Sequence, residues 1–104
     1  MKKVYLIKTE GSNYKIGTSK HPEKRLKQLQ TGNQEKLELI CSFESKYATL
    51  LESTLHRKYS HLKENGEWYA LSLEDEVNFI ENCQKTEANF MVLKEDDNLF
   101  FKKH

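Results

Sequence analysis

The sequence predicts an α+β fold, a three-stranded antiparallel sheet flanked by helices. Two β-prone runs lie on either side of a turn cluster near the N-terminus, a third β-prone run follows at 36–44, and stretches with helical spacing of apolar residues lie between and after them. With 104 residues, 37% of them hydrophobic and 32% charged, the chain matches one small globular domain with a modest core.

The first two strands are predicted to form a β-hairpin. Residues 3–8 alternate loosely between apolar and polar and are rich in strand formers. Residues 11–13 form a Gly-Ser-Asn turn cluster, and residues 14–18 favour a second strand. Together they predict two antiparallel strands joined by a tight connection.

Side-chain alternation relates the reactive groups of this hairpin to one another. Lys15 and Gly17 are two residues apart and therefore share a face of the second strand. If the register sets Tyr5 opposite Lys15 or Gly17, Tyr5 and Lys15 lie on the same face, opposite or diagonal to each other. Gly17 then leaves open space beside the Tyr5 phenol.

A short helix and a third strand are expected next. Pro22 fits the first position of a helix, and Gly32 ends it. Leu26 and Leu29 supply an inward-facing stripe. Residues 36–44 then mix apolar and polar residues in a way that suits a third strand against the hairpin.

A longer helix is predicted over residues 45–63, where apolar residues recur at helical spacing: Tyr47, Leu50, Leu51, Leu55, Tyr59 and Leu62. Gly66 breaks it, and residues 67–71 form a short extended piece. The glycine and the aromatic pair Trp68 and Tyr69 are typical of a turn back into the core. Base stacking by one of these rings is the alternative.

Another helix is predicted from Ser72 to about Gln84. Ser72 and Asp75 have the spacing of a capping box, in which each satisfies a backbone N–H group of the other at the start of a helix. The residues that this helix is predicted to bury are Leu73, Val77 and Ile80.

The segment 87–104 is expected to extend the 1–86 domain and to pack on it. β-prone runs at 89–94 and 99–103 flank the acidic residues 95–98, which predicts a C-terminal β-hairpin. The hairpin has more apolar residues than a solvated tail: Phe90, Val92, Phe100 and Phe101. They are expected to cap the sheet or the helices, with a homodimer contact as the alternative.

Charge is distributed unevenly along the chain. Residues 1–34 carry eight lysines and arginines against two glutamates, a net charge of +6. Residues 72–104 carry four basic and eight acidic residues, a net charge of −4. A basic front with an acidic back orients a domain on a polyanion such as DNA, although an uneven surface is the simpler interpretation.

Several other classes of protein are not favoured. No apolar run approaches the roughly 20 residues of a membrane span, and the N-terminus lacks the core of a signal peptide, so no membrane partner is expected. Cys41 and Cys83 lack the spacing of a zinc site or a disulfide framework. A cytoplasmic location is therefore expected.

Five segments together resemble a known family: Val4-Tyr5-Leu6, Tyr14-Lys15-Ile16-Gly17-Thr18, Arg25-Leu26 with Leu29-Gln30-Thr31-Gly32-Asn33, Glu52 with Leu55-His56, and Gly66-Glu67-Trp68-Tyr69. In this order and at these spacings the chain resembles the GIY-YIG nuclease superfamily. It is more closely similar to the small, often phage-borne branch named after the meiotically up-regulated gene 113 domain. Lys3 and Lys15 replace a glycine and a tyrosine of the wider superfamily, and Tyr14 lies one residue early, on the opposite face.

The resemblance implies a metal-dependent endonuclease that hydrolyses phosphodiester bonds of DNA, with one divalent ion, Mg²⁺ or Mn²⁺. It implies that Tyr5 orients or deprotonates the attacking water and that Glu52 binds the metal ion. Lys15, in place of the second tyrosine, and Arg25 are expected to contact the scissile phosphate; for Lys15 an exposed strand lysine is the alternative. His56, four residues after Glu52, is expected to shuttle a proton, bind the metal ion or hydrogen-bond to Glu52.

The residues around Arg25 are expected to bind nucleic acid. Arg25 borders the buried face of its helix, from which a guanidinium can give two charge-assisted hydrogen bonds to phosphate. Lys20, Lys24 and Lys27 surround it and are expected to contact the nucleic-acid backbone; a solvated helix face is the alternative.

The alternative function is a catalytically inactive protein with the GIY-YIG fold, from a phage or mobile element, that binds nucleic acid or a host protein. Lys3, Lys15 and the C-terminal extension favour it, because each departs from the nuclease pattern or adds surface. Tyr5, Arg25 and Glu52 together argue against it.

Overall fold

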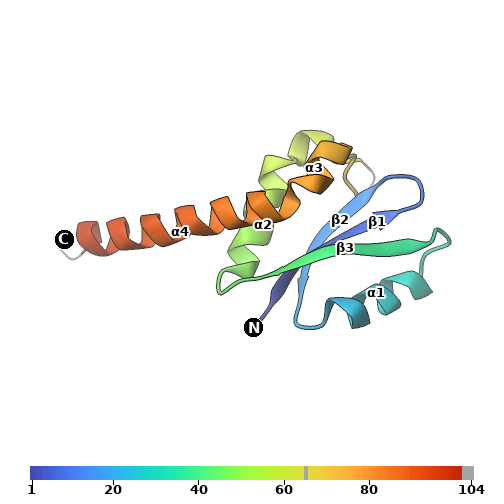
Figure 1. The fold of residues 1–104 in the computed structure, drawn as a ribbon, viewed down its shortest axis with the longest axis horizontal. Helices are drawn as coiled ribbons and strands as arrows, with labels where there is room; N and C mark the ends of the chain where they lie inside the picture. Colours follow the sequence, from blue (N-terminus) through green and yellow to red (C-terminus); the bar gives the residue numbers. More distant parts are fainter. Residues whose placement is uncertain (65, 102–104) are drawn as a thin grey trace.

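A three-stranded antiparallel sheet lies at the centre of the computed structural model, which describes residues 1–64 and 66–101, with side chains as far as Lys94. The elements in chain order are β1 (Lys3–Thr9), β2 (Tyr14–Ser19), α1 (Pro22–Thr31), β3 (Leu37–Glu44), α2 (Ala48–Lys58), the 3₁₀-helix η1 (Ser60–Leu62), α3 (Leu73–Val77) and α4 (Phe79–Phe101). The strand order is β2-β1-β3, so β1 is central. The predicted α+β class is confirmed (Figure 1).

The register of the hairpin puts Tyr5 and Lys15 on one face of the sheet. Tyr5 lies opposite Gly17, and Ile7 lies opposite Lys15. Tyr5 and Lys15 are therefore diagonal neighbours, one of the two arrangements that side-chain alternation allowed. β1 pairs with β3 on its other side, with an irregularity between Leu6 and Ile7.

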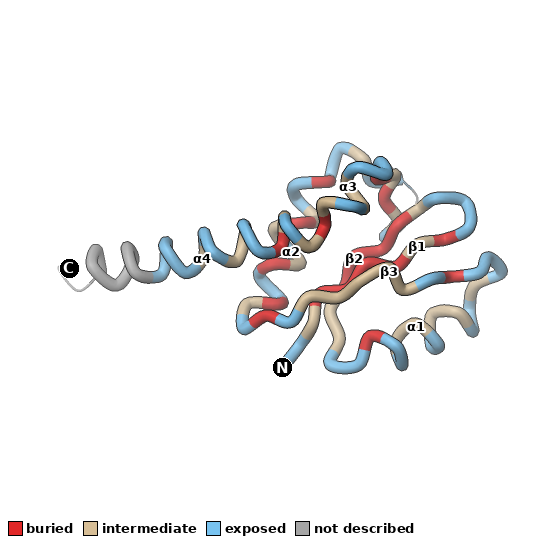
Figure 2. Tube along the Cα trace, viewed as in Figure 1, coloured by how far each residue is buried: buried red, intermediate tan, exposed pale blue. Residues whose placement is uncertain are grey.

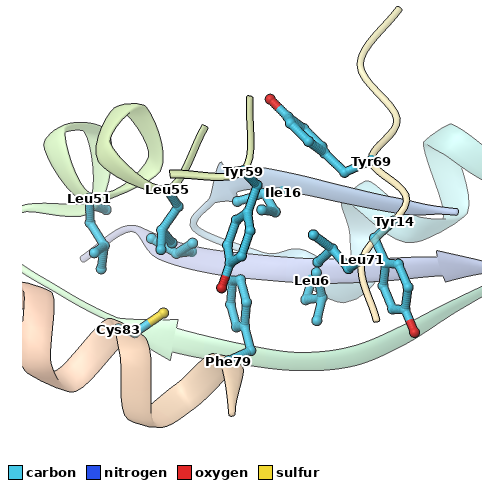
Figure 3. Close-up of a cluster of buried hydrophobic side chains, with 12 residues drawn as sticks. Leu6, Tyr14, Ile16, Leu51, Leu55, Tyr59, Tyr69, Leu71, Phe79 and Cys83 are labelled. Carbon is cyan, nitrogen blue, oxygen red and sulfur yellow. The ribbon is translucent and has the colours of Figure 1, made fainter. Parts of the chain in front are cut away.

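Two hydrophobic clusters lie on opposite faces of the sheet. The larger, which joins the sheet to α2 and α4, consists of Val4, Leu6, Tyr14, Ile16, Ala48, Leu51, Leu55, Tyr59, Tyr69, Leu71, Phe79 and Cys83 (Figure 3). The smaller consists of Tyr5, Ile7 and Leu37, with Leu26 and Leu29 of α1 and Trp68 packed against it. Tyr14 and Tyr5 thus point to opposite faces, as alternation along the strands predicted. Buried residues follow β1 and β2 through the centre of the molecule (Figure 2).

The helix predicted over 45–63 is shorter than expected. Ser45 forms a turn before α2, in which its hydroxyl accepts a hydrogen bond from the Tyr47 backbone N–H at 3.0 Å. At the other end, Tyr59 leaves helical geometry and η1 follows. The Tyr59 ring is buried in the core, and its hydroxyl accepts a hydrogen bond from the Asn82 side chain at 3.2 Å.

The capping box predicted at the start of α3 is confirmed. The Ser72 hydroxyl accepts from the Asp75 backbone N–H, and the Asp75 carboxylate accepts from the Ser72 N–H, both at 3.0 Å. The helix itself has only five residues. Leu73 and Val77 are 67% and 73% exposed, so their predicted burial was wrong.

The reason is that α3 turns a glutamate toward the sheet. Glu76 accepts hydrogen bonds from the Tyr14 hydroxyl at 2.6 Å and from the Lys8 ammonium at 3.0 Å. The chain leaves helical geometry after α3 and begins α4. Phe79, which is fully buried, and Ile80, which is half-buried, occupy the core positions at this point.

The predicted C-terminal β-hairpin is wrong. α4 runs as one helix through the first predicted strand, 89–94, and through most of the second, 99–103; residues 102 and 103 lie outside the described residues. The segment contains no glycine or proline to interrupt a helix. Alanine, methionine, leucine, lysine and glutamate in it all favour a helix over a strand.

α4 packs on the domain through its first part and then extends beyond the sheet (Figure 1). Phe90 packs edge-on against the Tyr47 ring, with 6.1 Å between the ring centroids. Met91, Val92 and Leu93 are each more than half exposed. Of the four residues predicted to cap the core, Phe90 does so and Val92 does not, and the side chains of the other two lie outside those described. The predicted dimer contact stays a prediction. Within the described chain, no helix is both long and apolar enough to cross a membrane.

Both cysteine thiols are held in their neutral form by burial. Burial raises the pKa of the Cys41 thiol to about 11 and that of the Cys83 thiol to about 12. Because the thiolate is the nucleophilic and metal-binding form, neither thiol is activated at neutral pH. Cys83 instead fills space between α4 and the sheet.

The Glu76 interactions predict a pH-dependent stability. Hydrogen bonds from Tyr14 and Lys8 hold the pKa of the Glu76 carboxyl below its usual range. The stabilisation is therefore complete above the pKa of an unfolded glutamate, about 4.3, and is lost as the pH falls through the lower folded pKa. We expect Glu76→Gln to lower the free energy of unfolding by about 1–2 kcal/mol at neutral pH, and by much less at about pH 3.

Urea unfolding at the two pH values measures this effect. Glu74→Gln is the control, because Glu74 is an exposed residue of the same short helix. It should change the unfolding midpoint little at either pH. A Glu76→Gln effect that is equally large in acid would show that the carboxylate charge is not what stabilises this contact.

Candidate functional site

A hollow of about 400 Å³ lies beside the outer edge of β2. All five residues that the sequence predicted to be catalytic line it: Tyr5, Lys15, Arg25, Glu52 and His56. They come from four elements, β1, β2, α1 and α2. Residues up to 51 positions apart in sequence are thus brought to one place, although their catalytic roles stay predictions.

Two faces of the sheet contribute to the hollow because β2 is an edge strand. Tyr5 and Lys15 lie on the face that α1 covers. Glu52 and His56 belong to α2, which packs against the opposite face. In the described part of the chain the sheet has no strand beyond β2, so side chains from both faces border the same space at this edge.

Gly17 makes room for the Tyr5 phenol. A Cβ atom on Gly17 would overlap the hydroxyl and the adjacent ring carbon of Tyr5. The space that the glycine was predicted to leave is therefore occupied by the phenol itself. Tyr5 is 2% exposed, yet it lines the hollow, so its ring is fixed by packing while one side borders the open space.

Lys15 is a buried cation with one carboxylate partner. Its ammonium donates to the carboxylate of Glu67 and lies 5.8 Å from the centroid of the Trp68 ring. A buried ammonium is stable only when it is paired and hydrogen-bonded. The simple alternative of an exposed strand lysine is therefore wrong for Lys15, which is 7% exposed.

Glu67 is a site residue that the sequence analysis missed. It lines the hollow, and its pKa is lowered chiefly by the hydrogen bond from Lys15, with a smaller contribution from the charge of Arg25. Its only signal in the sequence was its place in the Gly66 to Tyr69 segment, which was read as structural. The pairing with Lys15 spans 52 residues and leaves no local pattern.

His56 is held by the backbone of β2 and not by Glu52. Its Nε2 atom lies 2.8 Å from the carbonyl oxygen of Ile16. A carbonyl only accepts, so Nε2 carries the hydrogen, and Nδ1 is the acceptor of the neutral ring. The ring also stacks on Tyr69, with 5.7 Å between centroids and 23° between planes. The predicted hydrogen bond between His56 and Glu52 is replaced by this contact.

Glu52 supplies a half-buried carboxylate to the hollow. Burial and, second, the charge of Glu52 raise the pKa of the neighbouring Tyr69 phenol. Within the described residues there is no cluster of three or more His, Cys, Asp or Glu side chains that would bind a metal ion by themselves. A single carboxylate in an open, polar hollow nevertheless fits Mg²⁺, which keeps several waters and takes further oxygens from a substrate phosphate.

Arg25 borders the hollow, whereas the three nearby lysines do not. The Arg25 guanidinium donates a long hydrogen bond to Gln28, at 3.3 Å, within α1. Lys20, Lys24 and Lys27 are exposed, and none of them lines the hollow, so their contact with nucleic acid stays a prediction. Lys63, which the sequence analysis did not select, also lines the hollow.

The segment after η1 closes the outer edge of β2. Gly66 has a φ of +62°, a left-handed conformation that favours glycine. Tyr69 then pairs with Tyr14 through both backbone groups, each at 2.8 Å. Trp68 packs on the smaller cluster. The structural role predicted for this segment is confirmed. Figure 3 also shows the Tyr69 hydroxyl pointing away from the core cluster.

Comparison with known proteins places the chain in a family. The model of the T5orf172 domain matches residues 2–89. The chain belongs to the T5orf172 domain family. This domain is linked to nuclease-related proteins of phages. No curated protein and no solved structure matches the chain. Every residue that lines the hollow lies within the T5orf172 match, whereas the distal part of α4 lies beyond it.

The contact between Gly17 and Tyr5 predicts the effect of a single methyl group. We expect Gly17→Ala to destabilise the domain by about 1–3 kcal/mol, because the Tyr5 ring must leave its packed position. Gly32→Ala is the matched control, since nothing lies within 4 Å of a Cβ atom there and Gly32 has a φ of −97°.

Thermal unfolding followed by circular dichroism measures both variants. The control should unfold at or slightly above the temperature of the parent protein. If Gly17→Ala unfolds with the control, the ring of Tyr5 is not constrained by β2, and its position in the hollow is not set by packing.

Proposed function

We propose that this T5orf172 domain is a metal-dependent endonuclease of the GIY-YIG type that hydrolyses phosphodiester bonds of DNA. The observation that carries the proposal is the meeting of Tyr5, Lys15, Arg25, Glu52 and His56 around one hollow. Phosphodiester hydrolysis needs a positioned water, neutralisation of charge on the phosphoryl oxygens and a group that stabilises the leaving oxygen. This set of side chains offers a candidate for each role.

The cations of the hollow are assigned to the phosphate. Lys15 approaches from the sheet and Arg25 from α1, so the two charges border the hollow from different elements. Arg25 is well suited because its 3.3 Å hydrogen bond to Gln28 is weak and is readily exchanged for two charge-assisted bonds to phosphoryl oxygens. Lys15 acts as a compact point charge.

The proton transfers are assigned to Tyr5 and His56. The Tyr5 hydroxyl, fixed over Gly17, orients the attacking water. His56 donates through Nε2 to the Ile16 carbonyl, which leaves Nδ1 of the neutral ring as a proton acceptor that can relay the proton to solvent. Glu52 would hold Mg²⁺ or Mn²⁺, which when bound neutralises charge on the phosphate and the leaving oxygen.

A specific observation also supports the non-cleaving alternative. The ammonium that would contact the phosphate already donates to Glu67 within the chain. A protein that keeps this fold for binding alone has no need to release that pair. Cleavage of supercoiled plasmid in Mg²⁺ or Mn²⁺, with and without chelator, decides between the two functions.

The metal assignment predicts the effect of removing one charge. We expect Glu52→Gln to abolish metal-dependent plasmid cleavage while the fold is kept, because the amide has the same size and lacks the charge that holds the ion. Glu38→Gln, an exposed change of the same charge on β3, is the control and should cleave like the parent. Parental cleavage by Glu52→Gln in Mg²⁺ would refute the role of this carboxylate.

The phosphate assignment predicts that lysine cannot replace Arg25. We expect Arg25→Lys to lose nearly as much activity as Arg25→Ala, roughly 10²–10³-fold, because a point charge does not reproduce a planar two-donor contact. Both variants should fold, since Leu26 and Leu29 make the packing contacts of α1. Single-turnover cleavage and circular dichroism test this. A Lys variant that cleaves like the parent, or an Ala variant that unfolds, would make Arg25 a structural residue.

A further inference from the structure

The buried Lys15 ammonium of the hollow already has an anionic partner within the chain, the carboxylate of Glu67. Lys15 is 7% exposed, whereas the side chain of its partner Glu67 is 78% exposed. The carboxylate therefore comes from the solvent side and reaches in to a buried ammonium. Arg25 also stabilises its charged form. The Glu67 carboxylate thus lies on the buried ammonium, at the hollow that Arg25 also lines.

This is the place where the proposed function puts a phosphate. A phosphodiester oxygen and a carboxylate oxygen are both anionic acceptors, and they suit a lysine ammonium at similar distances. Both anions beside Lys15 would repel each other in a partly desolvated space, where charge–charge energies exceed those in water. Occupation by Glu67 and occupation by phosphate therefore compete.

We propose that Glu67 is a built-in competitor for the phosphodiester, and that a substrate must displace its carboxylate from Lys15 before it binds in the hollow. This inference rests on the proposed function and adds regulation of the same site. It also names a substrate class. A single small anion gains only what Glu67 already supplies, whereas a nucleic-acid strand gains contacts at Arg25 and Lys63 as well.

The geometry allows the Glu67 side chain to leave. It is mostly exposed, so little packing is lost when it turns outward. Gly66, the residue before it, is left-handed, and nothing lies within 4 Å of the position a Cβ atom would take there. Lys15 keeps the face of the Trp68 ring at 5.8 Å, so its charge is not left without a partner while the anions exchange.

Binding of a short fluorescein-labelled DNA duplex in the presence of a chelator tests the proposal by fluorescence anisotropy, without cleavage. We expect Glu67→Gln to bind roughly tenfold more tightly than the parent, because the neutral amide no longer competes for Lys15. Glu64→Gln is the matched control. It removes the same charge from Glu64, an exposed residue that lies three positions before Glu67 and does not line the hollow. It should change the dissociation constant by no more than about twofold.

Two further variants separate competition from a general charge effect. Glu67→Asp keeps the net charge and shortens the reach by one methylene, so it should gain part of the affinity. In a Lys15→Gln background, Glu67→Gln should gain nothing beyond the Glu64→Gln control. Equal affinities for Glu67→Gln and Glu64→Gln, including no measurable binding by either, would overturn the proposal, as would a full gain in the Lys15→Gln background.

The outcome is independent of catalysis. If Glu67→Gln gains affinity but neither it nor the parent cleaves plasmid in Mg²⁺ or Mn²⁺, the competitor role stands and the endonuclease proposal fails. If the parent cleaves and Glu67→Gln gains no affinity, the endonuclease proposal stands and the competitor role fails.

Discussion

The outer edge of β2 is the constraint on which the site depends. Backbone groups along a strand edge need partners, and here the chain supplies them itself. Tyr69 pairs with Tyr14 through two hydrogen bonds of 2.8 Å, and the His56 ring bonds to the Ile16 carbonyl at 2.8 Å. The first contact holds the segment that carries Glu67 against the sheet, and the second holds α2, which carries Glu52. The contacts that give the backbone groups of the β2 edge their partners therefore also bring the carboxylates of Glu67 and Glu52 to the hollow that Lys15 lines.

The burial of Lys15 is a consequence of the same arrangement. On an exposed edge its ammonium would extend into water, but the segment that follows Gly66 covers it with Trp68 and Glu67. Once covered, the ammonium needs an anion, and Glu67 is the acidic side chain that the segment presents. Under the proposed function, a hollow that binds a phosphate anion would thus be stable without one. The pair that stabilises the empty hollow would then be the pair that a ligand has to separate.

The sequence predicted the parts of the fold that depend on local pattern. Period-two alternation predicted the face that Tyr5 and Lys15 share, and Pro22 predicted the start of α1. Contacts between residues that are distant in the sequence could not be predicted from it. The Lys15–Glu67 pair spans 52 residues and the contact of His56 with the Ile16 carbonyl spans 40, so neither leaves a spacing signal. The capping box of α3 was predicted, but the face that the helix buries was not, because it follows the distant Tyr14 and Lys8.

In the C-terminal segment the residue types alone did not decide between helix and strand, because residues that prefer each are mixed there. Valine and phenylalanine in 89–94 suggested a strand, yet α4 has already begun at Phe79. Extending an existing helix fixes only one residue for each hydrogen bond gained, whereas starting a hairpin requires a new nucleus. Residues 72–104, which form α3 and α4 as far as the structure describes them, carry a net charge of −4. The hollow lies instead among the basic residues that begin the chain. If the domain acts on a polyanion, as we propose, this distribution of charge would turn the β2 edge toward it and α4 away from it, although the total charge is only +1.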